Sequence, residues 1–212
     1  TEIKNISLGL LSTDGRFKRI LINEVSDISN RSTTILKLKK NIKLKSCILC
    51  EENSYLYTVS DIGRIIKIKV TKDIFPFMGK LAQGNTIMKL FPGENIIQAL
   101  SIQKNQIKDL ILITNKGSFV RHTTKEIKIS KKGELGTIGI HFNDNKKSID
   151  RVNNCFINNK NLYIKTTKDR YERLRHDLIN SSLYKKETKL NLELNNDELI
   201  KSTFSMIIPE KD

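Results

Sequence analysis

The stretch Leu110 to His122, LILITNKGSFVRH, reads as an apolar strand, a polar turn with a glycine, and a second strand with apolar and basic residues. This pattern predicts a β-hairpin, because glycine readily takes the positive φ that tight hairpin turns require. The same plan recurs without a gap at Leu8 to Ile20 (LGLLSTDGRFKRI), Leu56 to Ile68 (LYTVSDIGRIIKI) and Leu162 to Leu174 (LYIKTTKDRYERL). The chain is therefore expected to consist of repeats.

Fixed positions recur in all four hairpins. Ser or Thr follows the first Leu by four residues, and the turn residue follows it by seven. The turn residues are Gly15, Gly63, Gly117 and Asp169, which lie 48, 54 and 52 residues apart. Such variation is normal when loops differ between repeats. We expect one domain, residues 1–212, with repeats at approximately 1–53, 54–105, 106–158 and 159–212.

Two further strands are predicted after each hairpin. A glycine-rich or basic stretch leads to a strand that ends at Leu38, Leu90, Phe142 or Leu194, and a last apolar strand follows, such as Ile96 to Ile102. Tyr171 to Ser182 is the best helical candidate, but its aligned partners are rich in β-formers, so we interpret it as strand. Four short antiparallel strands per repeat predict an all-β, propeller-like fold of about four blades.

The charge of the chain indicates a polyanionic partner. The 212 residues have a net charge of +15, and the four repeats carry excess positive charges of +4, +4, +5 and +2. The charge is thus spread over the repeats and is not a tail. No run of about 18 apolar residues and no signal peptide occur, so a soluble, intracellular protein is expected. The chain begins with Thr1, which suggests an excised domain.

The repeats resemble the β-pinwheel repeats of the A subunits of DNA gyrase and topoisomerase IV. The residues that carry the resemblance are DLILITNKGSFVRHTTKEIKISKKGELGTIGI (Asp109 to Ile140), LYTVSDIGRIIKI (Leu56 to Ile68) and FPFMGKLAQG (Phe75 to Gly84). The resemblance implies a β-pinwheel that follows the DNA-cleaving core of a bacterial type IIA topoisomerase. It also implies that a basic rim binds and bends duplex DNA, which is thereby presented to that core.

A comparison with the gyrase motif favours topoisomerase IV. Gyrase subunits carry a box of the form QRRGGRG in the first blade, whereas Asn30 to Thr34 reads NRSTT here. Partial matches to this box occur at Gly79 to Gly84 (GKLAQG) and Lys131 to Gly136 (KKGELG). We therefore expect modest DNA bending, without the tight wrapping attributed to gyrase.

The candidate DNA-binding residues are bases that recur beside the turns or lie in the glycine-containing stretches. A single Lys is more often solvated surface, and some arginines could instead brace neighbouring blades. A base at the same place in each blade nevertheless suits the regular phosphate charge of DNA, and Arg can bind phosphate bidentately. The candidates are Arg16, Arg19, Arg64, Lys67, Lys80, Arg121, Lys131, Lys132, Arg170 and Arg173.

No catalytic or metal site is predicted in this chain. Arg170-Tyr171 superficially resembles the Arg-Tyr pair that cleaves DNA, but the alignment with Phe17, Ile65 and Phe119 predicts that Tyr171 is a core residue. Cys47 and Cys50 form half of a zinc or redox pattern, and their apolar context favours a buried strand. No cofactor is expected, and ATP and Mg²⁺ would belong to the parent enzyme.

Two functional classes remain open at this stage. The first is a DNA-binding module whose partners are double-stranded DNA, the cleavage core and the ATPase subunit, in a cytoplasmic protein associated with the nucleoid and not with a membrane. The second is a propeller for protein interaction whose basic rim contacts an acidic partner. A steep salt dependence of binding to DNA of any sequence would favour the first.

Overall fold

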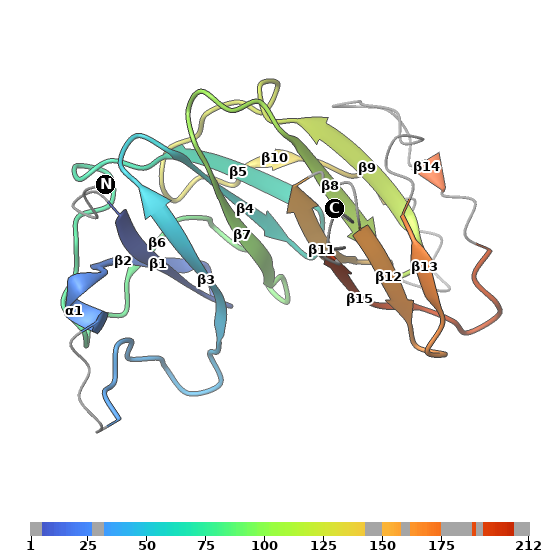
Figure 1. Cartoon of the computed structure of the whole chain (residues 1–212), viewed down its shortest axis with the longest axis horizontal. Helices are drawn as coiled ribbons and strands as arrows, with labels where there is room; N and C mark the ends of the chain where they lie inside the picture. Colours follow the sequence, from blue (N-terminus) through green and yellow to red (C-terminus); the bar gives the residue numbers. More distant parts are fainter. Residues whose placement is uncertain are drawn as a thin grey trace, which may run out of the picture. The chain divides into compact units, whose positions relative to one another are not determined.

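The computed structural model describes residues 6–26, 32–142, 150–157, 162–174, 188–189 and 193–205. Within these ranges the fold is almost entirely β, with three four-stranded sheets and one three-stranded sheet, all antiparallel (Figure 1). A single short helix, α1 (Asn23–Ser26), follows the first hairpin in the described part. No helix in these ranges is long and apolar enough to cross a membrane. The predicted all-β fold is confirmed.

We call the four sheets blades 1 to 4. Blade 1 contains β3 (Leu44–Glu51), β1 (Ile6–Ser12), β2 (Arg16–Leu21) and β6 (Asn85–Thr86). Blade 2 contains β10 (Thr137–Ile138), β5 (Arg64–Lys69), β4 (Tyr55–Ser60) and β7 (Ile96–Ile102). Blade 3 contains β11 (Val152–Ile157), β8 (Asp109–Thr114), β9 (Ser118–Thr123) and β14 (Thr188–Lys189). Blade 4 contains β13 (Tyr171–Arg173), β12 (Leu162–Thr166) and β15 (Ile200–Ser205).

The outer strand of a blade comes from the repeat that follows. β6 belongs to the second repeat but pairs with β2 of the first, and β10 and β14 are exchanged in the same way. Among the described residues, the second, third and fourth repeats each supply four strands, as predicted, but one of the four completes the preceding blade. The strand predicted to end at Leu38 does not form, since residues 32–43 are not assigned to a strand, and β6 and β10 end before the predicted Leu90 and Phe142.

The chain divides into two compact units. Unit 1 comprises Thr1–Ser60, Arg64–Gln106 and Lys128–Thr137, and unit 2 comprises Asp61–Gly63, Ile107–Ile127 and Ile138–Asp212. Blade 1 lies in unit 1, together with nearly all of blade 2, and blades 3 and 4 lie in unit 2. Phe17, Leu56 and Ile66 belong to the core of unit 1, and Ile111, Phe119 and Ile164 belong to that of unit 2.

The hairpin turns explain both recurrent positions of the sequence. Gly15, Gly63 and Gly117 have φ values of 78°, 80° and 82°, and Asp169 has 57°. The Ser or Thr before the turn is buried and binds the main chain across it. The amides of Arg64, Ser118 and Arg170 donate to the hydroxyls of Ser60, Thr114 and Thr166 at 3.3, 3.0 and 3.3 Å, whereas Ser12 Oγ donates to the carbonyl oxygen of Arg16 at 3.2 Å. The hydroxyl thus fixes the residue directly after the turn, which begins the second strand in blades 1 to 3.

Two expectations about single residues need correction. Tyr171 is not a core residue, since it is 58% exposed. Its hairpin partner is Lys165, where the other repeats have an apolar residue, and no outer strand is described beside β13. Cys47 and Cys50 lie in strand β3, but only Cys50 is buried, because successive side chains point to opposite faces. Of the stretch Tyr171 to Ser182, the structure assigns Tyr171–Arg173 to a strand, and residues 175–182 lie outside the described ranges.

Candidate nucleic-acid interface

Arg19 is a buried structural residue. Its Nε donates to Ser7 Oγ at 3.0 Å, its Nη1 to the carbonyl oxygen of Phe75 at 3.2 Å, and its Nη2 to Glu52 at 3.1 Å. The guanidinium group lies 4.7 Å from the ring centre of Phe77. Only 1% of Arg19 is exposed, so its side chain has no open face for a phosphate.

Arg64, which aligns with Arg16 and not with Arg19, is also buried and fully bonded. Its Nε donates to Glu94 at 2.9 Å, and Nη2 forms a second bond to the same carboxylate. Nη1 and Nη2 also donate to the carbonyl oxygens of Leu135 and Lys89, at 2.5 and 2.8 Å. Burial alone would raise the pKa of Glu94, but bonds from Arg64, Ser60 and the Phe91 amide outweigh it and lower the pKa. Glu94 therefore stays ionised beside the buried arginine.

Lys67 and Arg121 also bind within their own blades. Lys67 is buried, with Nζ 4.7 Å from the ring centre of Tyr55 and 5.5 Å from that of Tyr57, and burial lowers its pKa. Arg121 is half-buried and forms an ion pair with Asp109 at 2.6 Å. These two predicted DNA ligands occupy positions that stabilise β5 and β9.

The arginine after the turn binds a main-chain carbonyl oxygen of another segment in three blades. Arg16 Nη1 donates to the Gly84 carbonyl at 3.2 Å, and Arg170 Nη2 donates to the Glu193 carbonyl at 3.2 Å. Arg16, and Arg64 through Leu135, thereby hold the segments that lead into β6 and β10. Arg170 instead binds the chain beyond β14, as Arg64 binds Lys89 beyond β6. Arg16 and Arg170 remain half-exposed, and Arg173 is exposed.

The segments that lead into the outer strands are here called crossover loop 1 (residues 77–86) and crossover loop 2 (residues 129–138). Each first runs parallel to the second hairpin strand: the Met78 amide donates to the Arg19 carbonyl at 2.8 Å, and the Ser130 amide to the Lys67 carbonyl at 2.7 Å. Each then turns back to form β6 or β10. The two loops thereby form the outer edges of blades 1 and 2.

A glycine is required where each loop turns back against the sheet. Gly84 and Gly136 have φ values of 84° and 76°. A Cβ atom on them would lie 2.6 Å from the Phe17 carbonyl oxygen and 2.5 Å from that of Ile65. No side chain fits at such distances. This close approach accounts for the last glycine of both GKLAQG and KKGELG.

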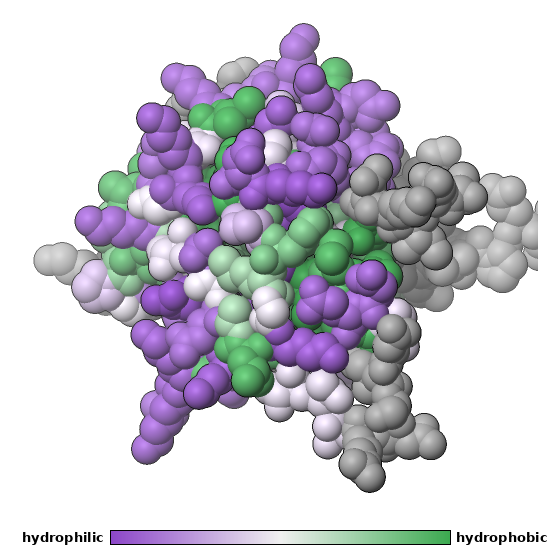
Figure 2. All heavy atoms as spheres, turned by 90° about the vertical axis from the view of Figure 1, so that its left-hand side faces the viewer, coloured by the Kyte–Doolittle hydropathy of each residue, from purple (hydrophilic) through white to green (hydrophobic). Residues whose placement is uncertain are grey.

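The crossover loops carry part of the exposed positive charge of unit 1. Lys131 and Lys132 are exposed, Lys80 is half-exposed at the place in loop 1 that Lys132 holds in loop 2, and Lys89 is exposed just beyond β6. The face shown in Figure 2 is mostly hydrophilic, with smaller hydrophobic areas between. The lysines among the predicted DNA ligands are thus better exposed than most of the arginines, with Lys67 as the exception.

A lysine-rich segment was not selected from the sequence. Residues 35–45 carry exposed lysines, namely Lys37, Lys39, Lys40, Lys43 and Lys45, and no acidic residue. Buried Lys18 joins this segment to crossover loop 1, because its Nζ donates to the carbonyl oxygens of Ile35 and Lys80 at 2.8 and 2.7 Å. Burial lowers the pKa of Lys18, and Glu24 partly opposes this effect. Local lysine density was the sequence signal that could have identified the segment.

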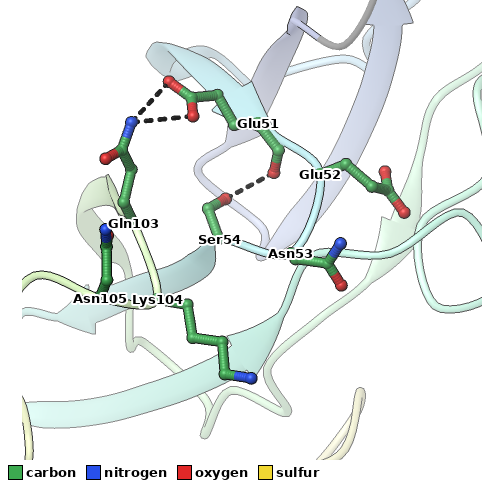
Figure 3. Close-up of a pocket in the computed structure, with 7 residues that line it drawn as sticks. All are labelled: Glu51, Glu52, Asn53, Ser54, Gln103, Lys104 and Asn105. Carbon is green, nitrogen blue, oxygen red and sulfur yellow. Dashed lines mark hydrogen bonds between the residues drawn. The ribbon is translucent and has the colours of Figure 1, made fainter.

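A polar pocket of about 250 Å³ lies at the start of β4, at the end of the strand opposite the Gly63 turn (Figure 3). Its carboxylates are already bound: Gln103 donates to both oxygens of Glu51, at 3.1 and 2.9 Å, and Glu52 accepts from Arg19. No cluster of three or more metal-ligating side chains occurs among the described residues. Nothing in this pocket indicates catalysis.

The blades define a class of protein: an all-β repeat domain with exchanged outer strands and lysines along the outer edges of unit 1. A comparison with protein families gives this class a name. Residues 10–51, 54–103 and 108–159 match the family described as DNA gyrase C-terminal domain, beta-propeller. These stretches coincide with the first three repeats and cover more than half of the chain, so the chain belongs to this family. It is a C-terminal module of type IIA topoisomerase A subunits, and the described residues contain no catalytic site.

Solved structures show the same fold. The chain is similar to the C-terminal domain of DNA topoisomerase IV (TM-score 0.82, 16% identity, 94% of this chain and 61% of that one). It is also similar to the DNA gyrase A C-terminal domain (TM-score 0.77, 16% identity, 96% and 66%) and the E. coli ParC C-terminal domain (TM-score 0.65, 15% identity, 95% and 80%). The chain thus spans slightly less than two thirds of the length of the first two. No curated protein matched the sequence.

Proposed function

We propose that this domain binds duplex DNA along the outer edges of its blades, bends it, and presents it to the cleavage core of a type IIA topoisomerase. The observation that carries the proposal is that the buried and the exposed basic residues have different roles. Buried arginines hold the blades together, while exposed lysines lie on the crossover loops and on residues 35–45. DNA carries one phosphate charge per about 1.7 Å of its axis, so several exposed lysines on one protein surface can neutralise several phosphates of the same duplex.

The salt dependence of binding tests this proposal. With about 4 to 8 phosphate contacts, the affinity should fall by about 10² or more between 50 and 200 mM salt, because each contact releases counterions. The probe is a mixed-sequence duplex, titrated at several salt concentrations and followed by fluorescence anisotropy. A flat salt dependence, or binding to an acidic protein in preference to DNA, would instead support a protein-interaction propeller.

A charge reversal on the crossover loops locates the interface. Substitution of Lys80, Lys131 and Lys132 by Glu should weaken binding to DNA of all sequences and reduce the salt slope by about 0.9 for each phosphate that the protein no longer neutralises. The matched control places Glu at Lys104, Lys108 and Lys201, which are also exposed but lie outside the crossover loops. Equal losses of affinity in both triple variants would mean that only net charge matters and that the chosen edge is wrong.

The type of topoisomerase is a finer part of the proposal. We favour a topoisomerase IV-like parent, with its ATPase subunit as a further partner, that relaxes or decatenates DNA, over a gyrase that introduces negative supercoils. Support comes from the sequence NRSTT in place of the glycine- and arginine-rich box and from the excess of only +2 in the fourth repeat. Bending a duplex by 40 to 90° costs on the order of 1 to 6 kcal/mol, which a few phosphate contacts can offset.

The topology that the bound domain imposes on DNA distinguishes the two. Nicked circles are ligated in the presence of the domain, and the topoisomers are separated on a gel. A topoisomerase IV-like domain should change the linking number only slightly. A large shift that grows with protein concentration would restore the gyrase interpretation.

A further inference from the structure

Crossover loop 1 has an apolar residue at the tip of its turn. The Ala82 amide donates to the Gly79 carbonyl at 3.1 Å, which places Leu81 third in a four-residue turn. Leu81 is 66% exposed, the largest exposed fraction among the large hydrophobic side chains of the described residues. Its neighbours in sequence are Lys80 and Ala82. At the tip of a basic loop, Leu81 is available to enter an apolar space in a partner.

The turn is held firmly from both sides. Before Leu81, Lys18 Nζ binds the Lys80 carbonyl at 2.7 Å, and the Met78 amide binds Arg19 in β2. After it, Gly84 lies directly on the main chain of Phe17, and Arg16 binds the Gly84 carbonyl. The loop therefore presents Leu81 in a fixed place. A fixed apolar tip loses little conformational entropy when it enters a partner.

The charge around the tip selects the kind of partner. Lys18 connects Lys80 to Ile35, where the exposed lysine-rich segment 35–45 begins. That segment carries no acidic side chain, and Glu24 is the acidic side chain that acts on Lys18. Blade 2 has Gly133 at the tip position, with nothing within 4 Å of a Cβ placed there. Crossover loop 2 exposes Ile129, Leu135 and Ile138 at other positions, so the difference between the two loops is the apolar residue at the tip itself. A single Leu is too small an apolar area to anchor a membrane, whereas lysines around one apolar wedge suit DNA.

We propose that Leu81 inserts from the minor groove between two base pairs and kinks the duplex at blade 1. This inference rests on the proposed DNA-binding function and adds the position and the means of the bend. Proteins that bind the minor groove insert apolar side chains at base steps and bend DNA by about 20 to 90° towards the major groove. The surrounding lysines supply affinity for phosphates, and Leu81 supplies the local unstacking.

The test separates unstacking from binding. The probe is a 30-base-pair duplex with one central TA step, which unstacks easily. It carries 2-aminopurine at that step and a donor and an acceptor dye at its ends. The protein should raise the 2-aminopurine fluorescence and bring the dyes closer. Leu81→Ala should abolish the fluorescence rise and reduce the bend, with an affinity change of less than about tenfold. Leu81→Met, which keeps the apolar bulk, should retain both signals.

Ile107→Ala is the matched control, since Ile107 is 64% exposed but lies outside the crossover loops. It should behave like the unchanged protein, and neither alanine variant should shift the urea midpoint, because both side chains are exposed. If Leu81→Ala keeps the 2-aminopurine signal and the bend, the wedge is wrong while DNA binding stands. If the unchanged protein fails to bind duplex with a steep salt dependence, the proposed function itself is wrong.

Discussion

Replacement of Arg64 by Met should destabilise blade 2 and should have no direct effect on DNA binding by the folded domain. The substitution removes two bonds to Glu94 and two to the main-chain carbonyls of Leu135 and Lys89, and it leaves the Glu94 carboxylate buried with no cation. Breaking a buried ion pair on one side costs about 3 to 5 kcal/mol. We therefore expect a loss of that size in the free energy of unfolding, measured by urea denaturation and far-UV circular dichroism.

The destabilisation caused by Arg64→Met should depend on pH in a defined direction. In the unchanged protein the pKa of Glu94 lies below its ordinary value, so the pair contributes stability above the unfolded pKa, near 4.3, and loses it as the pH falls through the folded value. Without Arg64, only the bonds from Ser60 and the Phe91 amide oppose the burial, so the pKa of Glu94 should rise and protonation should cost the folded state less than in the unchanged protein. The cost of the substitution should consequently shrink between pH 7 and pH 4.

The control for Arg64→Met is Arg173→Met, because Arg173 is exposed. It should change the free energy of unfolding by less than about 0.5 kcal/mol. The structural interpretation of Arg64 is refuted if Arg64→Met costs less than about 1 kcal/mol and yet abolishes DNA binding by the folded domain. That outcome would indicate that Arg64 contacts DNA directly.

Three further predictions concern a turn, a buried base and the exposed tyrosine. Gly136→Ala should destabilise the domain by about 1 to 3 kcal/mol in urea, because its Cβ would meet the Ile65 carbonyl at positive φ, whereas Gly79→Ala should be neutral. Burial lowers the pKa of His122, only partly opposed by its backbone bond, so stability should fall as the pH drops below about 6.5, and His122→Gln should flatten this dependence. Tyr171→Phe should leave DNA affinity unchanged, and neither protein should nick plasmid DNA with ATP and Mg²⁺; a covalent adduct at Tyr171 would contradict this.

The hairpins could be predicted from the sequence because their chemistry is local. Gly15, Gly63, Gly117 and Asp169 all have positive φ, and the recurrent Ser or Thr forms its bond within five residues of chain. The exchange of outer strands could not be predicted in this way. β6 pairs with a strand that lies more than sixty residues earlier in the chain. A strand of two residues has too short a sequence pattern to indicate which sheet edge it pairs with.

The candidate site shows the same limit. Alignment found that a base recurs after each turn, but it could not give the direction in which each side chain points. Whether Arg64 faces solvent or Glu94 depends on a carboxylate thirty residues away. Tyr171 shows the opposite error, because the alignment with Phe17 implied burial while Lys165 beside it changed the packing. The exposed lysines of residues 35–45 were visible in the sequence but matched no recurrent position.

The exchange of outer strands means that the repeat in the sequence is not the unit that folds. A chain cut at residue 105, at the end of the second repeat, keeps the hairpin of blade 2 but loses crossover loop 2 and β10. The main chain of β5 would then present unpaired amides and carbonyls at a sheet edge, a known template for aggregation. The physical module instead ends after the borrowed strand, near residue 140. Duplication or deletion of a repeat therefore alters two blades, because each repeat also supplies the outer strand of the preceding blade. The terminal blades need a strand or a loop from elsewhere to cover the edge that no further repeat completes.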